Sequence, residues 1–131
     1  MKAAINHFEN KLKFEIDSWD VNQAMEKKSK MIVIDARSEE AYENEHIPQA
    51  ISLHHQIMDE QNTVHLDKDF LYVTYCDGIG CNASTKGALK MTKLGFRTKE
   101  LLGGLDWWKR DGYRTEGKSG QQVVDISCHC D

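Results

Sequence analysis

The run of residues 70–75 (Phe-Leu-Tyr-Val-Thr-Tyr) limits most strongly what this chain can fold into. It is apolar, aromatic and β-branched, without the polar alternation of a half-exposed strand, and residues 31–34 (Met-Ile-Val-Ile) form a second continuous run. Such runs are typical of strands buried on both faces of a parallel sheet. Because helix-spaced segments lie between the strand-like ones, the sequence predicts one α/β domain with a mainly parallel central sheet.

Shorter elements are expected around these two runs. Ile5, Phe8 and Leu12 share one face of a helix, which predicts a helix over residues 1–13. Further strands are expected at 14–16, 50–53 and 98–102, further helices from Asp17 or Ser18 onward and at 38–42, 83–94 and 105–111, and irregular structure at 54–69.

Charge and hydropathy argue against several classes of partner. The chain of 131 residues has a net charge of −4 and a pI near 5.8, which disfavours nucleic acid or an anionic membrane as its main partner. No apolar run is long enough to span a membrane, and the polar N-terminal segment lacks the apolar core of a secretory signal. Four cysteines without such a signal are typical of reduced thiols, so we expect a cytoplasmic protein.

One cysteine, Cys76, stands where the strand at 70–75 ends, and a loop with two glycines leads from it into the next helix. Strand, tight loop and helix N-terminus form a cradle of backbone N–H groups, backed by the positive end of a helix dipole. A thiol in that cradle should ionise more easily than a free cysteine, so Cys76 is the candidate nucleophile. The alternative is an inert buried thiol. The loop that would bind the anion or substrate consists of Asp77, Gly78, Ile79, Gly80, Cys81 and Asn82.

Short motifs along the chain resemble, in their order and spacing, those of the rhodanese-like domain. They are Ile34-Asp35-Ala36-Arg37, Tyr42 with His46-Ile47-Pro48, Tyr75-Cys76, Leu94-Gly95-Phe96, and Leu102-Gly103-Gly104 followed by Trp107, Trp108 and Gly112-Tyr113. The resemblance implies a five-stranded, mainly parallel sheet flanked by helices on both faces. It places the domain at residues 14–116, with an N-terminal helix at 1–13 and a C-terminal tail at 117–131 outside the family pattern.

The resemblance also implies an activity. In this family the cysteine after the central strand accepts a sulfane sulfur as a persulfide, and the loop amides hold the anion. Cys76 would then carry sulfur from a small donor to an acceptor thiol, on a small molecule or a protein, without a metal or an organic cofactor. The sequence leaves the donor, the acceptor and the oligomeric state open.

The loop differs from that of a typical sulfurtransferase. It carries no basic residue, ends on Asn82 where related loops have an arginine, looks one residue longer, and places Asp77 beside the nucleophile. An asparagine provides no charge to hold a dianion, so these changes disfavour phosphate and weaken the case for thiosulfate. Asn82 is instead expected to cap the following helix. A phosphatase activity is therefore the least favoured, although related dual-specificity phosphatases have a loop of similar length.

Cys81 provides a second thiol in the same loop. It is either a resolving cysteine, which attacks an oxidised or persulfidated Cys76 to give a disulfide, or a small residue at a helix start without a chemical role. Two alternatives to sulfur transfer follow. One is a thiol redox protein that uses Cys76 and Cys81, and the other is a non-catalytic module in which the loop binds a partner.

Several other residues are candidates for the edge of the site. Asp35 and Arg37 follow a buried strand and are expected to form an ion pair, with Arg37 at the mouth of the pocket as the alternative. Trp107 and Trp108 are expected to be divided between core and pocket wall. Cys128-His129-Cys130 combines two thiols and an imidazole, which fits soft-metal binding, sulfur relay or a disordered tail.

Overall fold

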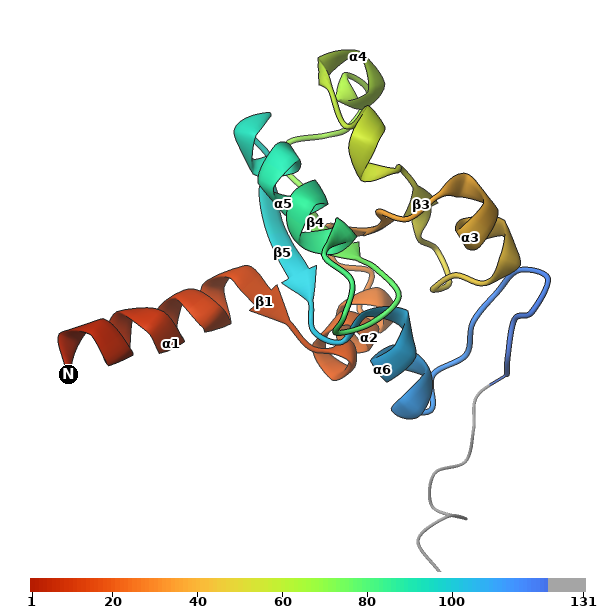
Figure 1. The fold of residues 1–131 in the computed structure, drawn as a ribbon, viewed down its shortest axis with the longest axis horizontal. Helices are drawn as coiled ribbons and strands as arrows, with labels where there is room; N and C mark the ends of the chain where they lie inside the picture. The colour runs from red at the N-terminus through yellow and green to blue at the C-terminus, as the bar shows by residue number, and fades with distance from the viewer. Residues whose placement is uncertain (123–131) are drawn as a thin grey trace, which may run out of the picture.

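The computed structural model describes residues 1–122, in which five strands form one sheet with helices on both faces (Figure 1). The strands are β1 (Glu15–Ile16), β2 (Met31–Asp35), β3 (Ile51–Ser52), β4 (Leu71–Tyr75) and β5 (Arg97–Leu101). Their order is β1-β5-β4-β2-β3, and the ladders between them are all parallel. The predicted α/β fold is therefore confirmed, and the sheet is wholly rather than mainly parallel.

The helices follow the expected pattern with one difference. They are α1 (Lys2–Phe14), α2 (Ser18–Glu26), α3 (Glu39–Asn44), the 3-10 helix η1 (His55–Ile57), α4 (Glu60–Thr63), α5 (Ala83–Lys93) and α6 (Gly104–Arg110). Asp17 caps α2 by accepting a bond from the Asp20 amide at 2.8 Å. The segment predicted to be irregular at 54–69 contains η1 and α4. Asp59 caps α4 through a bond from the Asn62 amide. This helix is too short to show an apolar period in the sequence. None of the helices in residues 1–122 is long and apolar enough to cross a bilayer.

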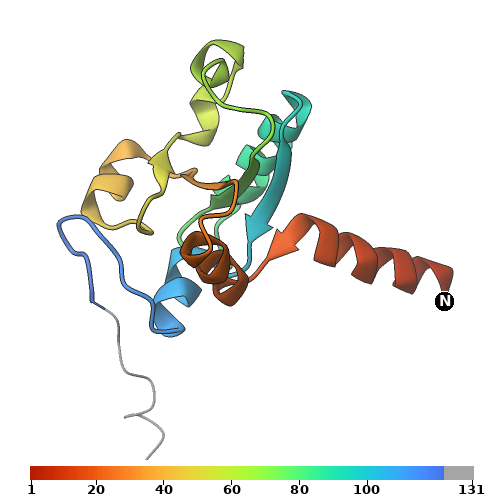
Figure 2. The same cartoon turned by 180° about the vertical axis from the view of Figure 1, so that it is seen from behind.

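Alternate residues of the two central strands pack on opposite faces of the sheet. Val33 and Val73 pack with residues of α2 and α6 on one face. Ile34 and Tyr72 pack with residues of α5 on the other. Figures 1 and 2 show α5 on one side of the sheet and α2 on the other. Because helices cover both faces, these strands carry no polar alternation, which explains the continuous apolar runs.

The two ends of the described chain differ in how they contact the rest of the domain. α1 projects away from the sheet (Figure 1). At the other end His46 and Glu116 form an antiparallel bridge, and the Ser119 amide donates to the carbonyl of Asn44 at 2.7 Å. The start of the segment predicted as a tail therefore bonds to α3, although the domain boundaries themselves remain predictions. Cys128-His129-Cys130 lies outside the described residues.

Candidate active site

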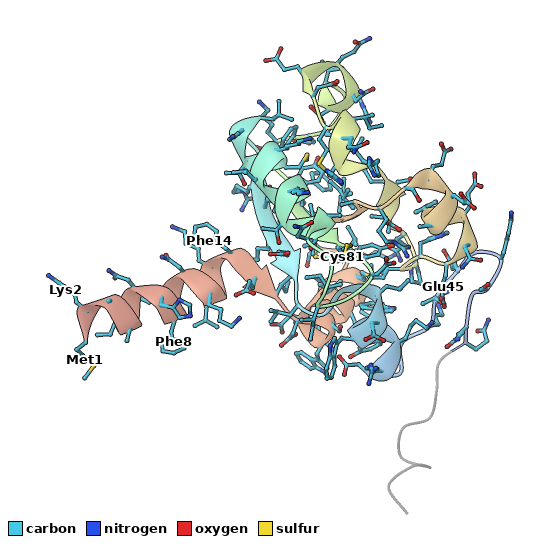
Figure 3. All side chains as sticks on the ribbon, viewed as in Figure 1. Met1, Lys2, Phe8, Phe14, Glu45 and Cys81 are labelled. Carbon is cyan, nitrogen blue, oxygen red and sulfur yellow. A yellow bond between two sulfur atoms is a disulfide. The ribbon has the colours of Figure 1, made fainter. Side chains whose placement is uncertain are left out.

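The loop after β4 lies at the carboxyl edge of the sheet, where the loops that follow β2 and β5 also emerge. Cys76 directly follows β4, and residues 77–82 lead into α5. Two main-chain bonds fasten the loop to α6. The Leu105 amide donates to the carbonyl of Cys76 (2.9 Å), and the Asp106 amide donates to that of Asp77 (2.8 Å). Figure 3 labels Cys81 within this loop.

Cys76 and Cys81 are joined by a disulfide, with 6.1 Å between their Cα atoms, which corrects the expectation of reduced thiols for this pair. This separation lies inside the range of about 4.4–6.8 Å that disulfides require, so the loop backbone places the two sulfurs within bonding reach. Cys76 is 1% exposed. Cys81 is half-buried and lines a cavity of about 280 Å³ together with residues from Gly78 to Asn82 and from Leu101 to Gly104. A molecule that enters this cavity therefore meets Cys81 before Cys76.

Only some backbone N–H groups of the loop donate hydrogen bonds to acceptors in the described chain. The Cys81 amide donates to the carbonyl of Gly78 at 3.2 Å. The amides of residues 77–80 meet no acceptor in the described part of the chain. Free donors beside a sulfur atom would stabilise its anion. The amides of residues 77–80 are therefore the loop donors still free to bind an anion, whereas Cys81 uses its amide within the loop.

Asn82 stands before α5 without capping it. Its side chain makes no capping bond, which corrects the expectation drawn from the preferences of asparagine. The hydroxyls of Ser84 and Thr85 donate instead to Glu100 Oε2, each at 2.6 Å. The Glu100 carboxylate, from β5, therefore lies at the first turn of α5, where the helix dipole favours negative charge. Sequence reasoning missed Glu100, because no local pattern tells which strand lies beside that turn.

Arg37 connects the end of β2 to the loop. Its guanidinium donates to both carboxylate oxygens of Asp35, at 2.9 and 2.7 Å, and to Asp77 at 2.8 Å. The Asp35 side chain is fully buried and that of Asp77 is 71% exposed. Burial by itself would lower the pKa of Arg37, but the bonds to Asp35 and Asp77 outweigh it and raise the pKa. The ion pair expected with Asp35 is present, and the same cation also reaches the loop.

The hydroxyl of Tyr75 completes this network beneath the loop. It donates to Asp35 Oδ2 at 2.9 Å and accepts from the Ile47 amide at 3.1 Å. Burial, and after it the charge of Asp35, raise the pKa of Tyr75. The phenol therefore stays protonated and remains a donor. The buried carboxylate of Asp35 is shared by a guanidinium and a hydroxyl, which fixes the ends of β2 and β4 side by side.

The two tryptophans of α6 have different surroundings. Trp108 is 2% exposed and donates from Nε1 to the carbonyl of Arg114 at 2.9 Å. Trp107 is 42% exposed and lines a hollow of about 410 Å³ with Ile79 and Leu102. Trp108 thus belongs to the core and Trp107 to the surface beside the loop. A role for Trp107 in binding substrate stays a prediction.

The donor atoms of Cys76, Asp77 and Cys81 lie within 4.8 Å of one another. Two sulfurs and a carboxylate would suit a thiophilic metal if both thiols were free. In this structure the sulfurs are bonded to each other and the carboxylate pairs with Arg37. The three side chains as they stand are therefore not a ligand set.

Gly104 lets the loop rest on α6. Its φ is +58°, and a β-carbon there would overlap the carbonyl oxygen of Cys76 and lie 3.1 Å from the Gly78 nitrogen. We expect Gly104→Ala to lower the free energy of unfolding by about 1–3 kcal/mol. Gly80→Ala is the control, because its β-carbon meets nothing within 4 Å, and we expect it to change stability by less than about 0.5 kcal/mol. Urea unfolding measures both, and equal effects would contradict this account.

The chain matches a known family model. Residues 18–111 match the family model described as the rhodanese-like domain. None of the curated proteins matches the chain.

Solved structures show the same fold. The BH2092 protein from Bacillus halodurans is 36% identical, with 98% of this chain and 97% of that chain covered and a TM-score of 0.86. A protein from Lactobacillus plantarum is 26% identical over 84% of this chain and 93% of its own, with a TM-score of 0.71. A thiosulfate sulfurtransferase from Pseudomonas aeruginosa is 17% identical over 90% of this chain and 23% of its own, with a TM-score of 0.71, and shows likeness of fold alone.

Proposed function

The chain belongs to the rhodanese-like domain family, and we propose that it is a sulfurtransferase or persulfide carrier that moves a sulfane sulfur through Cys76 to an acceptor thiol. The position of Cys76 carries this proposal. The thiol follows the central strand β4 and precedes a helix of 11 residues. It adjoins amides at 77–80 that lack an acceptor within residues 1–122. These donors and the helix dipole favour the thiolate, which is the nucleophilic form of cysteine.

The proposed transfer has two displacement steps. The Cys76 thiolate attacks the outer sulfur of a donor R–S–SH, the S–S bond of the donor breaks, and RS⁻ leaves with the bonding electrons. Cys76 then carries S–SH, whose anion has the same single charge as the thiolate and suits the same amides. An acceptor thiolate R′–S⁻ attacks the outer sulfur, which yields R′–S–SH and restores the Cys76 thiolate. No external oxidant or reductant is consumed.

The charges around the loop favour a persulfide donor, whose reacting group R–S–S⁻ carries a single charge, over the thiosulfate dianion. Asp77 lies in the loop and Glu100 lies at the first turn of α5. The guanidinium of Arg37 is already shared between Asp35 and Asp77. The cavity itself is lined by Glu15 and Glu100 and by no basic residue of the described chain, so a dianion entering it would meet two carboxylates.

Intact-mass spectrometry of the reduced protein tests the proposal. Incubation with glutathione persulfide is expected to add about 32 Da to Cys81→Ser, in which no neighbouring loop thiol can displace the sulfur, and clearly less to Cys76→Ser, with the adduct located on Cys76 after digestion. Thiosulfate is expected to react at least about tenfold more slowly. No sulfur addition from any donor, while a control sulfurtransferase reacts in parallel, would refute the proposal. Equal labelling of Cys76→Ser would refute the assignment of the residue.

A second candidate function rests on the disulfide between Cys76 and Cys81. In a thiol redox protein, or in a carrier that discharges its own persulfide, the Cys81 thiolate attacks the inner sulfur of Cys76–S–SH. The products are the Cys76–Cys81 disulfide and HS⁻. An external thiol would then attack Cys81, which faces the cavity, and release the Cys76 thiolate as the leaving group. The stabilised thiolate is the better leaving group, so this direction of reduction is also the faster one.

A further inference from the structure

Helix α1 has no partner within residues 1–122 that covers its apolar side chains. None of its 13 residues is buried. Figures 1 and 2 show that it projects away from the sheet from both viewing sides. An isolated helix of this length is only marginally stable in water. Packing of a second surface against its apolar side chains would therefore stabilise the helix.

Three exposed apolar residues of α1, together with Met1 at its N-cap position, have the spacing of a coiled-coil seam. Met1, Ile5, Phe8 and Leu12 follow one another at intervals of four, three and four residues, as the a and d positions of a heptad do. Their exposed fractions are 97, 51, 61 and 78%. Figure 3 shows Met1 and Phe8 on the same side of the helix and Phe14 on the other. This seam, defined by Met1, Ile5, Phe8 and Leu12, is narrow and suits another helix with the same spacing.

We propose that the chain forms a two-fold symmetric homodimer in which α1 pairs antiparallel with α1 of a second copy. In an antiparallel pair, a positions pack against d positions of the partner. Ile5 then contacts Phe8 of the partner subunit, and Leu12 contacts Met1 of the partner subunit. The two-fold axis repeats both contacts. The seam is therefore complementary to itself, which is what an isologous interface requires.

The charges beside the seam favour this orientation. Lys2 and Glu9 are seven residues apart and occupy the same flanking position of successive heptads. In the antiparallel pair Lys2 of one subunit lies beside Glu9 of the other, and symmetry makes two such pairs. A parallel pair would bring Ala4 beside Glu9 instead and would gain no ion pair. It would also align the two helix dipoles and crowd the two domains at the same end.

The body of the domain extends the seam. Phe8 and Leu12 form one wall of a hollow of about 540 Å³, and Ile16 and Leu102 lie on its other walls. The N-terminal end of the partner's α1 would lie beside Leu12 and enter this hollow. The likeness to the Bacillus halodurans protein covers 98% of the chain and so extends over α1.

Sedimentation equilibrium and light scattering test the dimer. Because only a few side chains per subunit are buried, we expect a weak interface with a dissociation constant on the order of micromolar. The wild-type protein should approach twice its chain mass of 15.0 kDa as concentration rises. Ile5→Glu and Phe8→Glu should remain monomeric. Asn10→Glu, which adds the same charge on the opposite side of α1, should dimerise like the wild type.

A charge exchange tests the orientation. Lys2→Glu and Glu9→Lys should each weaken the dimer several-fold, and the double variant should restore it, because it rebuilds both ion pairs in the antiparallel register. A wild-type protein that stays at 15.0 kDa up to about millimolar concentration would overturn the proposal. So would loss of the dimer in Asn10→Glu, or binding of monomers to anionic vesicles through Ile5 and Phe8. Sulfur uptake by Cys76 is read separately and is expected to be equal in Ile5→Glu and wild type.

Discussion

The Cys81→Ser variant is expected to hold a Cys76 persulfide at least about tenfold longer than the wild-type protein does. The two sulfurs are bonded in the structure, so the reduced loop need move little for the Cys81 thiolate to reach the inner sulfur of a persulfide. That attack expels HS⁻ and leaves a disulfide. Serine has a similar size, but its hydroxyl cannot displace HS⁻ from the persulfide. The persulfide of Cys81→Ser should therefore persist until an external thiol accepts its outer sulfur. Timed intact-mass spectra and a sulfide electrode follow both products after excess donor is removed.

The expected wild-type product weighs about two hydrogens less than the reduced protein, with one HS⁻ released per chain. Gly80→Ala is the matched control in the same loop, because it leaves both thiols in place and its β-carbon meets nothing within 4 Å. It should discharge the persulfide at the wild-type rate. If the wild-type persulfide lasts as long as that of Cys81→Ser, Cys81 does not resolve it. The protein would then be a simple carrier rather than a self-discharging or redox protein.

Arg37→Met is expected to lower the free energy of unfolding by about 3–5 kcal/mol. The Asp35 carboxylate is fully buried and receives two bonds from the Arg37 side chain. Without the guanidinium, this carboxylate would keep the Tyr75 hydroxyl and the amide of residue 37 as donors but would lose its balancing charge. The same guanidinium also donates to the carbonyl of Glu45 at 2.6 Å, which would lose its donor. Urea unfolding monitored by tryptophan fluorescence measures the change.

Asp77→Asn is the control for the exposed end of the same network. The Asp77 side chain is 71% exposed, so its pair with Arg37 is expected to contribute only about 0–1 kcal/mol to stability. The double variant Arg37→Met with Asp35→Asn removes both charges and should be more stable than Arg37→Met alone. A loss below about 1 kcal/mol in Arg37→Met would show that Asp35 does not depend on the guanidinium for its charge balance.

The strands and most helices could be predicted because their signals are local. The runs at 31–34 and 70–75 are β2 and β4 to within one residue at each end, since a strand covered on both faces must be apolar throughout. The turn at Asp59 was missed because a helix of four residues leaves no period to detect. The prediction that Asn82 caps α5 is wrong, because the N-cap preference of asparagine is an average over many helices. Here Glu100 receives the hydroxyls of the first turn.

By itself, the sequence determined the α/β class, the place of Cys76 between a buried strand and a helix, and the lack of a basic residue in its loop. Those features follow from neighbours in the chain. Only the tertiary structure decided that Arg37 reaches Asp77, that Glu100 lies beside α5 and that nothing within residues 1–122 covers the seam of α1. These contacts depend on which strands become neighbours in the sheet. The free energy that favours one strand order comes from packing throughout the core, so no single segment of the sequence reveals it.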